Sequence, residues 1–333
     1  MMKLATAVLL LSTCSIAGAE PPPSYSDAWY NAGSAANPFL RPLSLAASPQ
    51  GDIYLCEDSG KRVMRFSSTG TFLGQWGTQG SGDGQFEALN RLAVDPLGFV
   101  YTFDIRLDRV TKFDAVGNYV TKWGSTGNGN GQFQATRGIA VDGLSTVYTL
   151  DGGLARVTKF SPTGQYLLKW GSGGSGNGQF LFPADIAVDP DGDVWVVDYQ
   201  ANRLQEFRSD GTFVRSLGTT GTGPGQFDGP FGLDIDADGN LYVSEWGNSR
   251  VQKLAQDGSF LWQIGSGPPA EGVLADPSDV VSSKGAVYVV DYLDGRVVRY
   301  LEAVVPVTPT TWTRVKALLS NTAADRPQPP SDH

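Results

Sequence analysis

Residues 178–207 read GQFLFPADIAVDPDGDVWVVDYQANRLQEF and contain most of the pattern that decides the fold. A short apolar run at 186–188 leads into the turn signal Pro-Asp-Gly-Asp. Residues 194–198 are β-branched and aromatic, and residues 203–207 alternate between apolar and polar. With the run at 212–217 that follows, the pattern predicts four short antiparallel strands joined by tight turns.

The same pattern recurs along the chain every 47 residues. Trp76, Trp123 and Trp170 keep this interval, and Gly-Gln-Phe recurs with Gln85, Gln132, Gln179 and Gln226. An arginine recurs five times at the same spacing and once more after the loss of one residue, at Arg62, Arg109, Arg156, Arg203, Arg250 and Arg296. Four strands in each repeat of this length are typical of a propeller blade.

The recurring strands also predict the number of blades. First strands are expected to begin near six positions, Leu45, Leu92, Ile139, Ile186, Leu233 and Val280, whereas only five fourth strands follow them. Trp29 lies 47 residues before Trp76, so residues 25–30 should form the missing fourth strand and pair beside residues 296–301. This pairing would close the ring and cover an open strand edge. The sequence therefore predicts an all-β, six-bladed β-propeller over residues 24–301.

The unit from residue 178 to 207 resembles the NHL repeat, and the resemblance covers about residues 24–301. It implies a six-bladed β-propeller of the secreted bacterial type, in agreement with the strand count. It does not fix a function, because this fold hosts lyases, lactonases, RNA binders and receptor sensor domains.

The two ends of the chain do not follow the repeat. Residues 1–19 combine Lys3, an apolar stretch and the cleavage pattern Ala-Gly-Ala, which predicts a signal peptide and export to the periplasm or the extracellular space. A lipoprotein anchored at Cys14 is the minor alternative, since the Thr before that Cys fits a lipobox poorly. Residues 302–333 form a Pro-rich tail whose pattern at 310–319 fits one short helix, either as a strap against the propeller or as a sorting or docking tag.

Composition narrows the chemistry of any site. The formal charge of −9 makes nucleic acid a poor partner, and no window is apolar and long enough for a transmembrane segment. The only histidine is His333, which removes histidine-based catalysis and histidine-ligated metals from the folded domain. Cys56 would be the only cysteine after signal cleavage, so we expect no disulfide and a small buried side chain there. We expect a monomer.

Two acidic patterns are expected to be structural. A carboxylate precedes each recurring arginine by five residues, at Glu57, Asp104, Asp151, Asp198, Glu245 and Asp291. Because it occurs six times, it should serve the repeat by accepting loop N–H bonds beside the guanidinium. Asp234, Asp236, Asp238 and Glu245 match the EF-hand pattern, but Glu245 should lie at the far end of a strand. Calcium held by the turn carboxylates alone stays a minor alternative.

The resemblance also limits catalysis. Amidating lyases of this fold use histidine-ligated zinc with an arginine or tyrosine, streptogramin lyases use histidine, and lactonase-type propellers hold a divalent ion in the central tunnel. The residues just before the first strands are Ser44, Arg91, Gly138, Asp185, Gly232 and Asp279. Only Asp185 and Asp279 are carboxylates there, which is too few for an obvious oxygen cage. We expect no enzyme, no catalytic residue, no metal and no cofactor; a metal-dependent, lactonase-like hydrolase or lyase is the alternative.

A ligand-binding face is the favoured site. The position after each recurring carboxylate differs between repeats, as Asp58, Ile105, Gly152, Tyr199, Trp246 and Tyr292. The candidate residues are three rings from consecutive blades, a fourth ring, three arginines on the opposite side and two carboxylates: Tyr199, Trp246, Tyr292, Phe231, Arg91, Arg106, Arg137, Asp185 and Asp279. Aromatic residues and arginine dominate interface hot spots. The sequence predicts a secreted, non-catalytic binding, scaffold or sensor module for a protein, peptide or glycan. The other interpretation is that the aromatic rings merely cover the loop beneath them.

Overall fold

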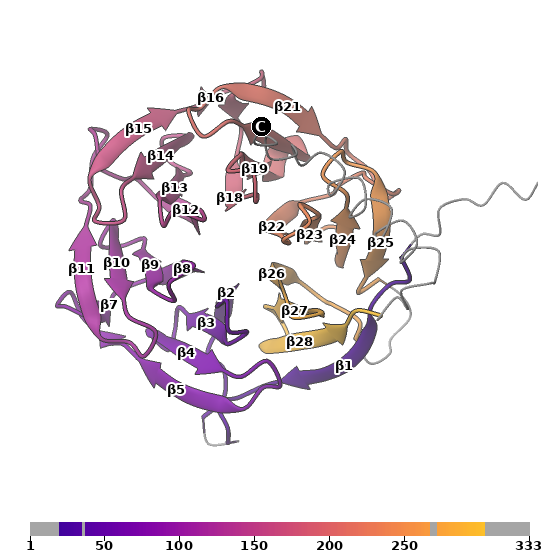
Figure 1. Ribbon diagram of the computed structural model, residues 1–333, viewed down its shortest axis with the longest axis horizontal. Helices are drawn as coiled ribbons and strands as arrows, with labels where there is room; N and C mark the ends of the chain where they lie inside the picture. Colours follow the sequence, from indigo (N-terminus) through magenta and orange to yellow (C-terminus); the bar gives the residue numbers. More distant parts are fainter. Residues whose placement is uncertain (1–19, 35–36, 267–271, 304–333) are drawn as a thin grey trace, which may run out of the picture. The chain divides into compact units, whose positions relative to one another are not determined.

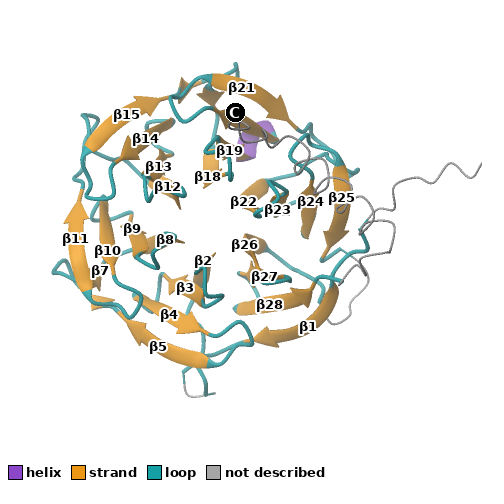
Figure 2. Cartoon of the chain, viewed as in Figure 1, coloured by secondary structure: helices purple, strands orange, loops and turns teal. Residues whose placement is uncertain are grey.

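The computed structural model describes residues 20–34, 37–266 and 272–303. It contains six four-stranded antiparallel sheets, arranged as blades around a central axis (Figure 1). Within these residues the only helical element is the 3-10 helix η1, Tyr199–Ala201 (Figure 2). The predicted all-β, six-bladed propeller is confirmed.

Every blade is ordered from an inner to an outer strand. Blade one comprises β2 (Pro42–Ala47), β3 (Ile53–Glu57), β4 (Arg62–Phe66) and β5 (Phe72–Trp76). Blade two comprises β8 (Leu89–Val94), β9 (Val100–Asp104), β10 (Arg109–Phe113) and β11 (Tyr119–Trp123). Blade three comprises β12 (Thr136–Val141), β13 (Val147–Asp151), β14 (Arg156–Phe160) and β15 (Tyr166–Trp170).

The second half of the ring follows the same order. Blade four comprises β18 (Pro183–Val188), β19 (Val194–Asp198), β20 (Arg203–Phe207) and β21 (Phe213–Leu217). Blade five comprises β22 (Pro230–Ile235), β23 (Leu241–Glu245), β24 (Arg250–Leu254) and β25 (Phe260–Ile264). Blade six comprises β26 (Pro277–Ser283), β27 (Ala286–Asp291), β28 (Arg296–Leu301) and β1 (Ser24–Trp29). Short parallel pairs lie in two linkers, namely β6 (Thr78–Gln79) with β7 (Gln85–Phe86), and β16 (Ser172–Gly173) with β17 (Gln179–Phe180).

The N-terminal strand completes the last blade. Strand β1 pairs antiparallel with β28, and Trp29 lies opposite Val297 (Figure 1). The indole of Trp29 is buried, with ring centroids 5.6 Å from those of Phe66 in blade one and Tyr288 in blade six. This strand therefore joins the first and last blades through both backbone pairing and aromatic packing.

The recurring tryptophan explains how neighbouring blades pack. Trp76 ends β5, and its ring lies against Gly117 in the β10–β11 turn of the next blade, so closely that a Cβ at Gly117 would overlap the indole. Trp123 meets Gly164 in the same way. Each tryptophan thus fills the space that a turn glycine leaves open in the following blade, which links two recurring features of the sequence.

Three expectations for the chain ends fall outside the described residues. These are the signal peptide at 1–19, most of the Pro-rich tail at 302–333 and the helix at 310–319. Within the part of the chain that the structure describes, no helix has the length and apolar character needed to cross a membrane.

Candidate functional site

One face of the ring carries the variable positions that follow the recurring carboxylates. In blade four, Asp198 at the end of β19 pairs with both Pro183 and Arg203, so the start of the first strand and the loop between the second and third strands share this face. We call it the loop face. In every blade the residue after the recurring carboxylate donates its backbone N–H to a carbonyl of the preceding linker, in the pairs Asp58–Arg41, Ile105–Ala88, Gly152–Ala135, Tyr199–Phe182, Trp246–Gly229 and Tyr292–Asp276.

The recurring carboxylates hold this loop in place. Asp198 is fully buried, and its Oδ1 accepts the backbone N–H groups of Leu181 at 3.1 Å and Phe182 at 2.9 Å. Arg203 lies 3.3 Å from Asp198 and donates to the carbonyl of Gln179. The same ion pair is present in blades one, five and six. In blades two and three the arginine donates to linker carbonyls and the carboxylate accepts loop N–H groups, so these contacts also support a structural role.

Four rings gather on the loop face between blades four and five. We call Phe182, Tyr199, Phe231 and Trp246 the ring cluster. Phe231 and Trp246 are stacked with centroids 3.9 Å apart and planes 14° apart. The Tyr199 centroid lies 5.5 Å from Phe182, 5.9 Å from Trp246 and 6.2 Å from Phe231. All four rings are partly exposed, so they pack on one another and still reach the surface.

Two arginines extend the ring cluster toward blades two and three. The guanidinium of Arg137 lies over Phe182, 3.9 Å from the ring centroid. Arg91, from β8 in blade two, lies 5.2 Å from the centroid of Phe231, which belongs to blade five. Its Nε–H also donates to the carbonyl of Arg137 at 2.8 Å. The arginines are therefore in contact with the rings rather than facing them from a distance.

Tyr292 and Arg106 lie apart from the ring cluster. The hydroxyl of Tyr292 accepts a hydrogen bond from Arg41 Nε at 2.9 Å, and Arg41 also pairs with Asp58 at 3.4 Å. Arg106 is exposed and lines a separate pocket of about 320 Å³ between blades one and two. The structure thus brings five of the candidate residues together at one place, namely Tyr199, Trp246, Phe231, Arg91 and Arg137.

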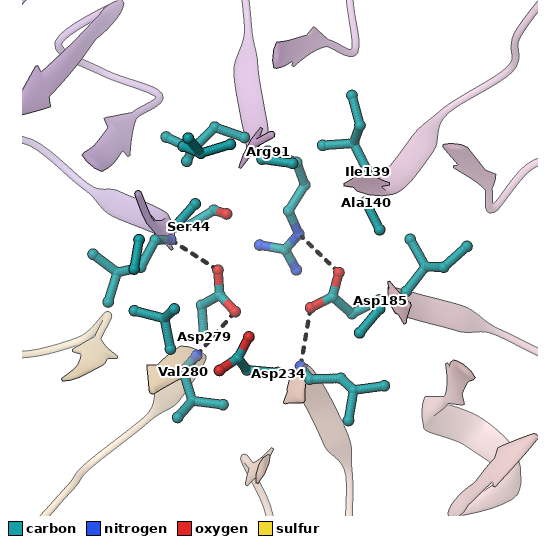
Figure 3. A pocket seen from close by; sticks show the side chains of 18 of the residues that line it. Ser44, Arg91, Ile139, Ala140, Asp185, Asp234, Asp279 and Val280 are labelled. Atoms are coloured by element: carbon teal, nitrogen blue, oxygen red, sulfur yellow. Dashed lines mark hydrogen bonds and ion pairs between the residues drawn. The ribbon is translucent and has the colours of Figure 1, made fainter. Parts of the chain in front are cut away.

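A central cavity of about 290 Å³ lies at the centre of the ring, lined by the six innermost strands (Figure 3). Blades two, four and six contribute the charged side chains Arg91, Asp185 and Asp279 to its lining. At the same repeat position the other blades have the small residues Ser44, Gly138 and Gly232. Each carboxylate accepts a backbone N–H from the following blade, Asp185 from Leu233 at 3.0 Å and Asp279 from Leu45 at 2.9 Å.

The lining of the cavity contains three carboxyl groups, Asp185, Asp234 and Asp279, and one arginine, Arg91. Arg91 Nε lies 3.9 Å from Asp185 Oδ1, and both side chains are buried. Burial raises the pKa of Asp185 and of Asp279 above the usual range, and Arg91 opposes this effect. Burial also raises the pKa of Asp234 to about 6, against the hydrogen bonds it accepts from Ser282. These carboxyl groups can therefore hold protons nearer neutral pH than ordinary aspartates.

The EF-hand match does not bring its residues together. Asp236 and Asp238 lie in the β22–β23 turn, where Asp236 accepts the N–H of Asp238 at 3.0 Å. Glu245 lies at the other end of β23, where it pairs with Arg250 at 2.6 Å. The sequence match therefore reflects repeat positions on two ends of one strand rather than a calcium loop.

The described residues contain one set of three carboxylates whose oxygens are close enough together to hold a metal ion. Oxygens of Asp189, Asp193 and Glu206 lie within 4.8 Å of one another, whereas Asp185, Asp234 and Asp279 form no such group. Asp189 Oδ2 already accepts hydrogen bonds from Trp195 at 3.0 Å and from Gln256 at 3.1 Å. Glu206 is paired with Arg215. Two of the three carboxylates, Asp189 and Glu206, are therefore engaged by partners within the protein.

Cys56 is a core residue of β3. It is fully buried, and burial raises the pKa of its thiol to about 12. A thiol in this state is a poor nucleophile, since the thiolate is the reactive form. This agrees with its expected role as a small buried side chain.

Sequence reasoning missed three residues of these sites. Phe182 and Arg41 occupy the same repeat position, where other blades have Ala88, Ala135, Gly229 and Asp276. Asp234 stands where other blades have Ala46, Ala93, Ala140, Ala187 and Val281. All three positions vary between repeats, which is the same signal that singles out Tyr199.

These observations define the chain as a six-bladed β-propeller. The family model for the NHL repeat matches residues 180–207, so this propeller carries an NHL repeat. No curated protein matches the sequence.

The fold is similar to solved structures at low sequence identity. A streptogramin B lyase is 13% identical with a TM-score of 0.59, over 85% of this chain and 90% of the lyase chain. A protein of unknown function from Bacteroides thetaiotaomicron is 17% identical with a TM-score of 0.60, over 84% of this chain and 73% of its own. A chain of a nidogen/laminin complex is 18% identical with a TM-score of 0.51, over 67% of this chain and 79% of its own.

The expectation, drawn from composition, that this chain is not an enzyme is wrong. A streptogramin B lyase, which is an enzyme, is among the structures with this fold. The absence of a histidine from the folded domain excludes only histidine-based chemistry. Burial raises the pKa of Asp185 to about 7, so this carboxyl group can exchange protons near neutral pH, and burial raises the pKa of Asp279 as well.

Proposed function

We propose that this chain is an exported ligand-binding propeller that binds a peptide, a protein or a glycan at the ring cluster. The single observation that carries the proposal is the gathering of Phe182, Tyr199, Phe231 and Trp246, all partly exposed, at one side of the loop face. The repeat does not require rings there, because other blades have Asp58, Ile105 and Gly152 at the position of Tyr199.

The physical chemistry of the cluster supports binding. Tyrosine and tryptophan offer large contact areas with little conformational freedom to lose, and tyrosine adds a hydroxyl that can form a hydrogen bond. Loops on a rigid scaffold commonly carry binding residues, and here buried carboxylates such as Asp198 fix the loop backbone. A chain of the nidogen/laminin complex shows that this fold occurs within a protein complex.

A screen of the purified protein against a peptide library and a glycan array tests this proposal. The ligand that binds best is then measured against the double variant Tyr199→Ala/Trp246→Ala, and we expect binding at least about tenfold weaker. Tyr292→Ala is the matched control, since it removes a ring from the same repeat position outside the cluster. Urea unfolding of each variant shows whether lost binding merely reflects lost folding. Equal binding by the double variant and the wild type would refute the proposal.

A proton-transfer reaction in the central cavity is a second candidate function. Asp185 and Asp279 with raised pKa values, together with Arg91, favour it. Hydrolysis of a panel of lactones and esters, with and without divalent ions, tests this candidate. Activity that Asp185→Asn abolishes would support it, whereas activity that survives this change would place the reaction elsewhere.

A further inference from the structure

Within the described part of the chain, no acidic side chain is paired with the guanidinium of Arg137. It lies 3.9 Å from the centroid of the Phe182 ring and is partly buried. Among the residues that the structure describes, none gives this guanidinium a hydrogen bond or an ion pair. The other cationic partner of the ring cluster, Arg91, is used differently, since its guanidinium donates to the carbonyls of Arg137 and Leu43.

The side chain of Arg137 occupies space that is open because residue 152 is a glycine. A Cβ on Gly152 would overlap the side chain of Arg137. Gly152 occupies the repeat position that holds Tyr199 and Trp246 in blades four and five. In blade three, an arginine from the first strand therefore lies over the loop position that is filled by a ring in the next two blades.

The electrostatic setting favours an anion beside Arg137. Burial lowers the pKa of Arg137, and the positive charge of Arg91 lowers it further. A partly desolvated cation near a like charge gains from an anionic partner. The carboxylates of Asp185 and Asp279 are directed to the backbone N–H groups of Leu233 and Leu45 instead.

We propose that Arg137 binds a carboxylate of the ligand, and that the ligand is an acidic peptide whose apolar side chains contact the ring cluster. This inference rests on the proposed binding function. A guanidinium matches a carboxylate through two parallel N–H bonds, and the guanidinium of Arg137 is held beside the cluster by its position over Phe182. Trp246 and Arg91 engage the faces of Phe231, and Arg137 lies over Phe182. These two rings therefore leave little open face for a flat sugar ring, and their edges suit apolar side chains better.

Selection of random hexapeptides on the purified protein tests the inference. We expect the selected peptides to be enriched in Asp and Glu. Replacing the acidic residue of a selected peptide by its amide should weaken binding about tenfold to a hundredfold, the range for one charge-assisted contact. Arg137→Gln should cause the same loss for the acidic peptide and leave the amide peptide unaffected.

Two further variants separate the site from general charge and folding effects. Gly152→Ala keeps every charged group but displaces the Arg137 side chain, so it should weaken the acidic peptide selectively. Arg106→Gln removes a positive charge elsewhere on the loop face and should leave binding unchanged. Melting temperatures of all variants show whether each remains folded.

The outcomes distinguish this inference from the proposed function. Neutral peptides that need Tyr199 and Trp246 would overturn the carboxylate site and leave the binding face standing. Acidic peptides that need Arg137 but bind equally to the Tyr199→Ala/Trp246→Ala variant would overturn the ring cluster instead. Equal binding of acidic peptides by wild type and Arg137→Gln would overturn the inference, as would recovery of no peptide or a preference for acidic oligosaccharides.

Discussion

The backbone N–H of Tyr199 donates to the carbonyl of Phe182 at 3.0 Å, and the rings of these two residues lie 5.5 Å apart. The same backbone bond joins the corresponding positions in all six blades. The repeat therefore provides a constant frame in which two adjacent side chains are free to vary. In blade four both positions hold aromatic residues, and these are two of the four residues of the ring cluster.

The rings of Phe182 and Tyr199 should stabilise each other. We expect Phe182→Ala and Tyr199→Ala each to destabilise the fold, and the double variant to lose less than the sum, with a coupling of about 0.5–1.5 kcal/mol. A double-mutant cycle in urea measures this coupling. Strict additivity would mean that the two rings pack independently.

Closure of the ring should depend on Trp29. Deleting residues 20–32 removes β1, so the melting temperature should fall substantially because β28 is left as an open edge. Trp29→Ala should cost about 3–5 kcal/mol, since the indole packs against both Phe66 and Tyr288.

Leu73→Ala is the control for closure. Leu73 is an apolar residue on the outer strand of blade one, and it is 49% exposed. Its removal should cost less than about 1 kcal/mol. If the deletion of residues 20–32 left the melting temperature unchanged, closure by β1 would not stabilise the ring.

Packing between blades should be sensitive to Gly117. Both Gly117 and Gly192 have positive φ, 93° and 86°, so alanine at either costs roughly 1 kcal/mol in backbone strain. At Gly117 the new Cβ also meets the Trp76 ring, whereas nothing lies within 4 Å at Gly192. We expect Gly117→Ala to cost about 2–4 kcal/mol in total. Equal losses for the two variants in urea unfolding would show that the indole moves aside freely.

Much of this architecture could be predicted because repetition exposes it. The interval that placed Trp29 in phase with Trp76 correctly predicted β1, although that strand is separated by most of the chain from its partner β28. The ring cluster was only partly predicted. Side-chain contacts across the ring, such as Arg91 over Phe231, depend on which way each side chain turns, and a spacing of 47 residues carries no such information.

The carboxyl group of Asp234 should make stability depend on pH. Its pKa is about 6 in the folded chain, above its usual value of 3.8, so the folded state binds the proton more tightly than the unfolded state. The resulting stability is present below about pH 4 and is lost as pH rises through about 6.

Urea unfolding at pH 4.5 and 7.5 checks this dependence. Asp234→Asn should reduce the fall in stability between the two pH values by about 1–2 kcal/mol, because partial exposure screens the charge. Asp238→Asn removes a charge at the neighbouring exposed turn and should leave the pH dependence unchanged. An unaltered pH profile in Asp234→Asn would contradict the prediction.

A crystal structure of the protein with the tightest ligand from the peptide and glycan screens tests directly whether the ring cluster is the binding site. We expect the ligand to lie on the loop face, within about 4 Å of Tyr199 and Trp246. A ligand bound at the opposite end of the ring, for example at the exposed turn residues Leu97 and Leu144, with the ring cluster empty, would contradict the proposed binding site.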